Sequence, residues 1–472
     1  MNLLQHHMHN AMKLKQIYCC LFLISLVSIT GCMVGKKYSK PEAPTGIAYR
    51  DTVAADTTAL QKWFDLYEDK ALQTIIATTL DSNRDLLTAV ARIDEARMQS
   101  AIIKANLYPQ LNYTVGAGGG KAGSEAKKVV ASIDGSSFNM FGVLDWELDI
   151  WGKLRHNSRA AVANFLSEVQ NRNALQTSLV AEAATQYFLL RDLDNRLNIA
   201  QQTLVGRKEN TRIISERFDK GYVAEIDKLQ ALQQEYVVAA TIPALRRQIV
   251  TVENALRLLM GLGPGGIDRG LSNFDQIVSP DIPLGIPSLL LERRPDIMAA
   301  EQSMQAQFEL VGAAQANRLP SFTLTGILGF ASPQLSTFLS SNGLVANGFA
   351  DVAGPIFNFG QRKNAVIAQR HRFEQNYYQY QKTVLAAFGD VDNALTFYRT
   401  YTEEYEQRRA QVDAAQKALT LSNARYDNGY TSYVEVILMQ DNLFDAQFEE
   451  SQALRGKLTA LVQLYKSLGG GW

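Results

Sequence analysis

Cysteine is almost absent from this chain of 472 residues, which has only Cys19, Cys20 and Cys32. All three lie near the N-terminus, two of them inside an apolar stretch and the third just after it. So few cysteines exclude the set of several disulfide bonds that stabilises small secreted domains. The stability of this protein must therefore come from packing and assembly.

An excess of either charge is also missing, because 47 basic residues balance 47 acidic ones. No region is basic enough to predict nucleic-acid binding. After Cys32 there is no run of about 18 apolar residues, so no membrane helix is predicted there. If the mature chain spans a membrane, a closed β-barrel is the remaining way to do so.

Proline is missing from two long stretches, residues 153–220 and 361–428, each of which has a single glycine inside it. Each stretch predicts one helix of about 65 residues, roughly 100 Å long. Three segments show the apolar period of 3.5 residues that indicates coiled-coil packing, although a soluble bundle would show it too. They are Leu193, Leu197, Ala200 and Leu204; Leu245, Ile249, Val252, Leu256 and Leu259; and Leu454, Leu458, Leu461, Tyr465 and Leu468.

The N-terminus has the features of a secretory signal. Lys13 and Lys15 precede the apolar run 17–29, and small residues lead to Cys32. A transmembrane anchor is the alternative, but it needs about 20 apolar residues. The segment 1–31 is therefore predicted to be a signal peptide. Met12 is a plausible start, and the cluster His6, His7 and His9 would be lost on processing.

The chain repeats itself at a distance of 208 to 211 residues. A period this long is outside the roughly 20–50 residues of solenoid repeats. It predicts a duplicated domain in which each element occurs twice about a pseudo-twofold axis. The matching segments are 85–109 with 296–320, 150–153 with 358–361, and 217–222 with 425–430.

Four segments alternate apolar and polar residues, which predicts strands near 110–120, 137–150, 320–331 and 347–357. Their length and two-sided pattern suit a membrane barrel. Four strands are too few to close a barrel, whose smallest forms use about eight, so oligomerisation is predicted. The loops 116–137 and 331–343 are rich in glycine and serine and are expected to be extracellular turns.

Several blocks of sequence occur in the order typical of one family. They are 32–44 (CMVGKKYSKPEAP, with Lys36 where the family has proline), 289–297 (LLLERRPDI) followed by 299–301, 319–325, 354–360, and 383–388 followed by 390–391. With these blocks the chain resembles the TolC-like outer-membrane efflux family, specifically the acylated NodT/OprM-type channels of tripartite RND pumps. Cys32 after Thr30-Gly31 is similar to a lipobox, so the resemblance implies acylation of Cys32 and, with Met33 next, sorting to the outer membrane.

The resemblance implies a mixed α and β fold: a trimeric 12-stranded β-barrel with four strands from each protomer, continued by a periplasmic α-helical coiled-coil barrel and a small equatorial domain. The expected segments are a signal peptide (1–31), an extended or equatorial segment (32–62), the first repeat (63–260), an equatorial linker (261–292), the second repeat (293–468) and a tail (469–472).

The implied function is a non-enzymatic channel that passively conducts small toxic compounds from the periplasm to the exterior. The implied partners are further copies of the chain, a periplasmic adaptor, an inner-membrane RND transporter and outer-membrane lipid. Apart from a covalent lipid on Cys32, no cofactor and no metal is expected. The exported substrate is not predicted.

An enzyme is disfavoured because the Arg293–Asp296 cluster just before a helix typically supplies caps and ion pairs. His156 and His371 are 215 residues apart, and the glycine-rich 261–266 ends a helix rather than following a strand. A conduit for type I, ABC-driven secretion of proteins or oligosaccharides is the alternative, and a purely structural outer-membrane lipoprotein is a third reading.

Two functional sites are predicted from the repeat. Gly221-Tyr222 and Gly429-Tyr430 interrupt long helical patterns and are expected to form turns at the periplasmic tip, where the resemblance implies adaptor contact. Just past the second turn, Glu435, Leu438 and Asp441 lie near one helix face and are predicted to form the gate, with Leu438 as an apolar constriction between acidic rings. Asp227, the first-repeat counterpart of Glu435, is predicted to form ion pairs that hold the tip closed.

Overall fold

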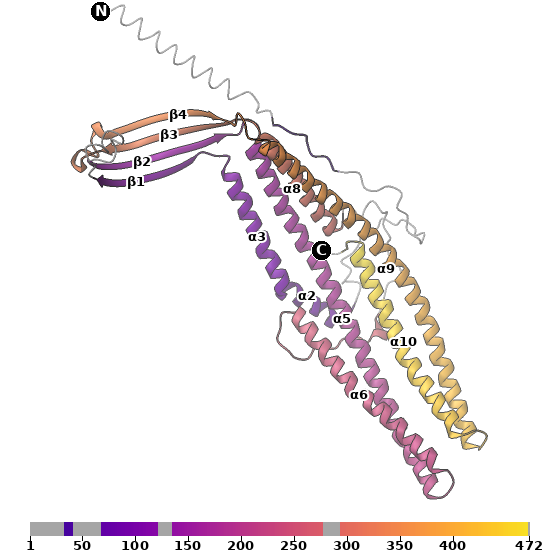
Figure 1. Cartoon of the computed structure of the whole chain (residues 1–472). Helices are drawn as coiled ribbons and strands as arrows, with labels where there is room; N and C mark the ends of the chain where they lie inside the picture. Colours follow the sequence, from indigo (N-terminus) through magenta and orange to yellow (C-terminus); the bar gives the residue numbers. More distant parts are fainter. Residues whose placement is uncertain (1–32, 41–67, 121–134, 277–292, 471–472) are drawn as a thin grey trace, which may run out of the picture. The chain divides into compact units, whose positions relative to one another are not determined.

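The computed structural model describes residues 33–40, 68–120, 135–276 and 293–470 (Figure 1). The predicted signal peptide, Cys32 and parts of the predicted equatorial segments, the first loop and the tail lie outside these ranges. The chain forms two compact units. Unit 1 comprises residues 1–40, 95–165 and 302–377, and unit 2 comprises residues 41–94, 166–301 and 378–472. Each unit thus combines segments from both halves of the duplication.

Unit 1 contains a four-stranded antiparallel sheet in the order β1-β2-β3-β4 (Figure 1). The strands are β1 (Gln110–Gly120), β2 (Gly135–Leu148), β3 (Ser321–Ser332) and β4 (Leu344–Ala353). Two short 3-10 turns, η4 (Leu335–Thr337) and η5 (Ser341–Gly343), connect β3 to β4.

The predicted bounds of the fourth strand, 347–357, were wrong by three residues at the start and four at the end, and those of the second, 137–150, by two at each end. The fourth strand starts earlier because Leu344 still pairs with Phe330 of β3. It ends at Ala353 because Gly354 and Pro355 follow. Proline has no backbone N–H to donate to a ladder, so pairing stops in front of it.

The helices follow the predicted duplication. They are α2 (Lys70–Ser82), α3 (Arg84–Ala105), α5 (Lys153–Asp219), α6 (Glu225–Leu259), α8 (Pro295–Ala316), α9 (Gln361–Asp427) and α10 (Tyr433–Ser467), with a 3-10 turn η3 (Asn273–Asp275). The two proline-free stretches are single helices of 67 residues each, as predicted. The pair α3 and α8 keeps the offset of 211 residues, and the pairs α5 with α9 and α6 with α10 keep 208.

The main hydrophobic core of unit 2 lies between α2, α5, α6 and α10. The heptad positions predicted from the sequence supply much of it, with Leu193, Leu256 and Leu458 all buried. Burying such side chains contributes roughly 1.5–3 kcal/mol each. The prediction that the 3.5-residue period marks buried helix faces is therefore confirmed for these segments, while coiled-coil packing stays a prediction.

No helix within the described residues is long and apolar enough to cross a membrane.

Candidate functional site

The sheet of unit 1 has one continuous apolar face. Residues directly opposite in an antiparallel ladder share a face, and the register places Leu324 opposite Trp146 on one side and Ala350 on the other. In the same way, the register of the other strand pairs places apolar residues opposite one another along the sheet. The members of this face are Leu111, Tyr113, Val115, Ala117, Phe138, Met140, Leu144, Trp146, Leu148, Phe322, Leu324, Leu328, Phe330, Leu344, Ala346, Ala350 and Val352. The predicted two-sided pattern is thus confirmed.

The opposite face is more polar. Thr325 pairs with Asp145 in the register, and its hydroxyl lies 3.3 Å from the Asp145 carboxylate. Thr323 pairs with Glu147 and Asp351 in the same way. One side of the sheet therefore suits an apolar medium and the other suits water.

The two predicted turns are glycine-capped helix ends. Gly221 and Gly429 have φ angles of 78° and 77°, in the left-handed region that glycine adopts without strain. The next residues close the caps, because the N–H of Tyr222 donates to Arg217 O and that of Tyr430 donates to Arg425 O, each at 2.9 Å. These turns join α5 to α6 and α9 to α10, forming two helical hairpins (Figure 1). The turn prediction is confirmed.

A small hydrophobic cluster joins the two hairpins near these turns. Ile214 of α5 and Ala231 of α6 pack with Tyr433, Val436 and Ile437 of α10. Burial raises the pKa of Tyr433 to about 12, so its hydroxyl stays neutral in the physiological range. The hairpin ends are therefore held together by packing as well as by polar contacts.

A buried polar contact between the hairpins is made by Arg207 of α5. Its side chain is only 3% exposed, and its Nη2 lies 2.6 Å from Asp441 Oδ1 of α10. Its Nη1 donates to the Gln440 side chain at 2.5 Å, and Gln234 of α6 donates to the other oxygen of Asp441 at 3.2 Å. Asp441 thus accepts from both helices of the first hairpin.

The other predicted gate residues have different surroundings. Glu435 lies 3.7 Å from Arg425 and accepts a hydrogen bond from Thr431, while the Leu438 side chain is 54% exposed. Among the residues that the structure describes, Asp227 has no ion-pair partner within the chain. Its negative charge lies near Tyr433. Ion pairs from Asp227 therefore stay a prediction. Among the described residues, the ion pair of Arg207 with Asp441 is one that links the two hairpins.

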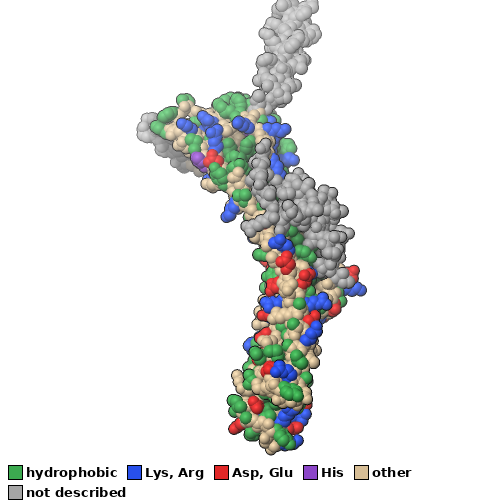
Figure 2. Space-filling model, turned by 90° about the vertical axis from the view of Figure 1, so that its right-hand side faces the viewer, with side chains coloured by type: hydrophobic (Ala, Val, Ile, Leu, Met, Phe, Trp, Pro, Cys, Tyr) green, Lys and Arg blue, Asp and Glu red, His purple; other side chains and the backbone are tan. Residues whose placement is uncertain are grey.

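Further acidic residues continue along α10 beyond Asp441. Burial raises the pKa of Asp445, and the charges of Asp441 and Glu449 raise it further. On the face of the molecule that Figure 2 shows, acidic and basic side chains are intermixed, in keeping with the balanced composition. Negative charge is thus concentrated on this stretch of α10.

The Arg293–Asp296 cluster has the structural role predicted for it. Arg294 Nη2 lies 2.7 Å from Asp296 and 3.0 Å from Asp390 of α9, and its Nη1 donates to the Ser467 carbonyl at the end of α10. Burial lowers the pKa of Arg294, but hydrogen bonds and charges of both carboxylates raise it above its ordinary value.

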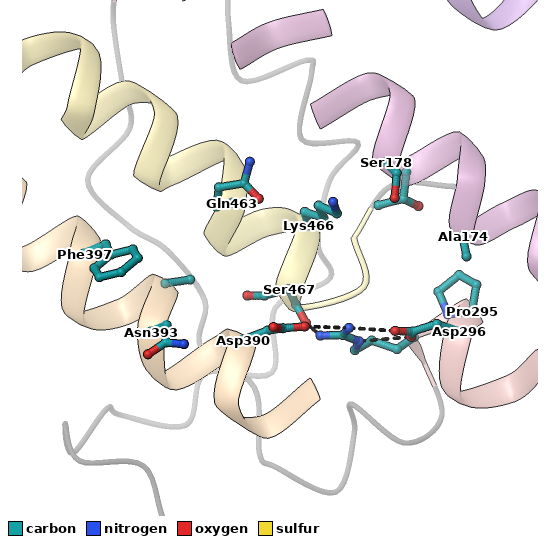
Figure 3. Close-up of a pocket in the computed structure, with 13 residues that line it drawn as sticks. Ala174, Ser178, Pro295, Asp296, Asp390, Asn393, Phe397, Gln463, Lys466 and Ser467 are labelled. Atoms are coloured by element: carbon teal, nitrogen blue, oxygen red, sulfur yellow. Dashed lines mark hydrogen bonds and ion pairs between the residues drawn. The ribbon is translucent and has the colours of Figure 1, made fainter. Parts of the chain in front are cut away.

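Beside this cluster lies a cavity of about 360 Å³ between α5, α8, α9 and α10 (Figure 3). Lys466, Asn393 and Phe397 line it. The positive charges of Arg294 and Lys466 on its wall balance the negative charges of two aspartates, Asp296 and Asp390. No nucleophile is paired with a base there. Among the described residues no group of three or more His, Cys, Asp or Glu side chains is placed to hold a metal.

Sequence reasoning missed the contacts between charged side chains that are far apart in the chain. Arg207 and Asp441 are 234 positions apart, and His156 of α5 lies 2.5 Å from Glu309 of α8, which is 153 positions away. Neither pair belongs to a motif or to the repeat. Only the arrangement of the helices brings these side chains together.

Comparison with known proteins places these features in one family. Residues 75–262 and 286–470 match the family model described as outer membrane efflux protein. The toluene efflux pump outer membrane protein TtgC of Pseudomonas putida is 31% identical over 456 residues, 94% of this chain and 93% of that protein. The probable outer membrane lipoprotein SilC of Salmonella typhimurium is 28% identical, over 96% of this chain and all of SilC.

Solved structures agree. The open state of the Neisseria gonorrhoeae MtrE outer membrane channel superimposes with a TM-score of 0.84 at 27% identity, covering 93% of this chain and 98% of MtrE.

Proposed function

The chain belongs to the outer membrane efflux protein family, a non-enzymatic transport family of the outer membrane, and from this premise we propose that it is the passive outer-membrane channel of a tripartite RND-type efflux pump. In this proposal the channel carries small toxic compounds from the periplasm to the exterior. The energy comes from an inner-membrane transporter, to which a periplasmic adaptor connects the channel.

The observation that carries this proposal is the amphipathic sheet with two unpaired edges. In the order β1-β2-β3-β4, the strands β1 and β4 each pair with one strand among the residues that the structure describes. Unpaired strand edges are not tolerated in lipid, because their N–H and C=O groups would lack partners. We propose that three copies join β1 of one to β4 of the next and close a 12-stranded barrel with the apolar face outward.

A charge on the apolar face tests this arrangement. Leu324→Arg is expected to cost about 2–4 kcal/mol near the bilayer midplane and to reduce the yield of heat-modifiable trimers in outer membranes. Thr323→Arg is the matched control, because Thr323 is the neighbouring residue on the polar face, opposite Glu147 and Asp351. Equal trimer yields for the two variants, or folded soluble monomers, would contradict the barrel.

We also propose that Cys32 is acylated and anchors each chain in the outer membrane. The lipobox-like sequence supports this, as does the similarity to SilC, named a probable outer membrane lipoprotein. Cys32→Ala is expected to abolish incorporation of a palmitate probe, because no other cysteine remains after processing. Labelling that persists in this variant would show that the lipid is not attached to Cys32. Some trimer should survive, since the barrel itself spans the membrane.

The hairpin ends are proposed to form the periplasmic tip. Tyr222 and Tyr430 are each 77% exposed there, which suits contact with the adaptor. The gate is proposed to lie just past the second turn, at Glu435, Leu438 and Asp441. Both carboxylates, of Glu435 and Asp441, have basic partners within the chain, so acidic rings would gain their full charge only when those ion pairs open.

Deleting the gene tests the function as a whole. Because toluene and antibiotic efflux proteins of Pseudomonas putida are 31% identical to this chain, we expect the deletion strain to become sensitive to solvents, antibiotics or both, and plasmid-borne wild type to restore resistance. The purified trimer should conduct ions in planar bilayers. Loss of secreted protein with unchanged toxicant resistance would instead favour the type I secretion conduit.

A further inference from the structure

The short segment next to Cys32 is docked on unit 1 by a buried histidine. His156 of α5 is 2% exposed, and its Nδ1 lies 2.5 Å from Oε2 of Glu309 on α8, which is 7% exposed. The other ring nitrogen, Nε2, lies 3.0 Å from the carbonyl oxygen of Val34. The efflux function proposed above gives these three residues no role.

Both nitrogens of the His156 ring face oxygen atoms, so each must take part in a hydrogen bond. Nε2–H donates to Val34, and one further proton is shared between Nδ1 and Glu309, whichever of the two carries it. Without Glu309 the ring would have an unpaired buried nitrogen, which is costly. The glutamate therefore fixes the orientation in which the histidine holds the backbone of Val34.

Three glycines make room for this arrangement. A Cβ on Gly312 would come within 2.6 Å of His156 Nε2, so the ring lies against the backbone of α8. Gly35 has a φ of 138° and passes over the same ring. Gly152, with a φ of 81°, faces Met33, whose Cγ would be 2.6 Å from an added Cβ. Larger residues at these positions would displace the segment.

Backbone and ring contacts extend the docking along the segment. The N–H of Val34 donates to Trp151 O at 3.1 Å, and Tyr38 packs edge-on against Phe308 of α8. Trp151 in turn donates from its indole nitrogen to Pro320 O, just before β3. The docked segment thus lies where β2 ends and β3 begins.

We propose that His156 and Glu309 form a latch that docks residues 33–38 at this end of the sheet and so positions the lipid anchor. The proposal rests on acylation of Cys32, as proposed above. Cys32 directly precedes Met33 in the chain, and consecutive Cα atoms are about 3.8 Å apart, so holding Met33 limits how far the anchor can move. His156 is a positioning residue: it acts on the anchor through the backbone of Val34.

Thiol labelling tests the latch directly. Val34→Cys leaves both backbone hydrogen bonds in place and introduces a half-buried thiol, while Ser39→Cys gives an exposed reference. Maleimide is added to outer membranes containing assembled trimer. With the latch intact, the thiol at position 34 should react much more slowly than the thiol at position 39. Adding His156→Ala should raise the rate at position 34 by about two- to tenfold, the equivalent of one lost hydrogen bond to a backbone carbonyl.

Matched variants separate the latch from general damage. Glu309→Gln can still donate to Nδ1 and should keep the thiol at position 34 protected, whereas Glu309→Leu and Gly312→Val should expose it. His371→Ala removes a histidine–glutamate contact of the same unit, in which the histidine is 65% exposed, and should change nothing. Each labelling rate is measured on the trimer band of a gel, so that only assembled protein is counted. If one variant fails to assemble, the remaining variants still test the latch.

Equal protection of the introduced thiol in the Val34→Cys parent and in its His156→Ala and Gly312→Val derivatives would overturn the latch. Palmitate incorporation is expected to be unchanged in all of these variants. A chain without any introduced cysteine should not react with maleimide. If it does, Cys32 carries a free thiol, and the acylation proposal fails independently of the docking.

Discussion

Replacing Arg207 with methionine is expected to shift the channel toward its open state by roughly tenfold or more. The guanidinium is buried and joins α5 to Asp441 and Gln440 of α10. A hydrogen bond to a charged group is worth about 1.5–3 kcal/mol, and each 1.4 kcal/mol is a tenfold change in an equilibrium. Asp441 is 39% exposed, so the lower end of that range applies.

Methionine suits this position because it fills most of the volume of the arginine stem without its charge. The nearby cluster of Ile214, Tyr433 and Val436 should therefore stay packed. Single-channel recording of the purified trimer in planar bilayers gives the measurement: mean conductance and the fraction of time spent open should both rise.

Arg212→Met is the matched control for this experiment. Arg212 forms ion pairs with Glu209 and Glu216 of its own helix, and all three side chains are exposed. Losing pairs within one helix should leave the hairpins joined. If Arg207→Met conducts no more than wild type and Arg212→Met, the contact with Asp441 does not hold the channel closed.

The acidic residues of the proposed gate are tested in the same recordings. Glu435→Gln combined with Asp441→Asn should weaken block by divalent cations, because the carboxylates that would form acidic rings are gone. Unchanged conductance and unchanged block would place both residues away from the entrance.

Replacing Asp69 with alanine is expected to cost at least about 3 kcal/mol of stability, since several buried donors would lose their acceptor at once. The Asp69 carboxylate is 1% exposed. One oxygen caps α2 by accepting from the N–H groups of Ala71 and Leu72. The other accepts from the Tyr187 hydroxyl at 2.7 Å and from Leu271 N–H and the Gln276 amide, both at 2.9 Å.

Thermal unfolding of the purified protein, followed by helical circular dichroism, measures this loss. Asp268→Ala is the control, because Asp268 is an exposed acid of the same stretch of chain as Leu271. A melting temperature of Asp69→Ala equal to that of Asp268→Ala would show that the buried carboxylate contributes no net stability.

Tyr187 adds a pH dependence to the same cluster. Burial raises its pKa above the ordinary value, and the hydrogen bond to Asp69 raises it further. A raised pKa in the folded state gives stability that is complete below about pH 10, the value for an unfolded tyrosine, and is lost as the pH rises above it. Tyr187→Phe should reduce this alkaline loss while lowering stability at pH 7.

The sequence alone determined the features that follow from repeats, from alternation of side chains and from residues that end helices. The offsets of 208 and 211 residues set the paired helices, and the absence of proline set the length of α5 and α9. Gly221 and Gly429 set the hairpin turns, because glycine takes positive φ without strain. Alternation of side chains set which residues of each strand share a face. These features depend on neighbours in the chain, so the chain itself shows them.

Only the tertiary structure decided which distant side chains meet. Arg207 meets Asp441, and His156 meets Glu309 and Val34, across 122 to 234 positions. The bounds of β4 were likewise decided by its ladder partner Phe330 at one end and by Pro355 at the other. No periodic sequence pattern predicts such contacts, because each forms where two helices or strands cross. The sequence around a single buried charge also does not indicate which distant residue neutralises it.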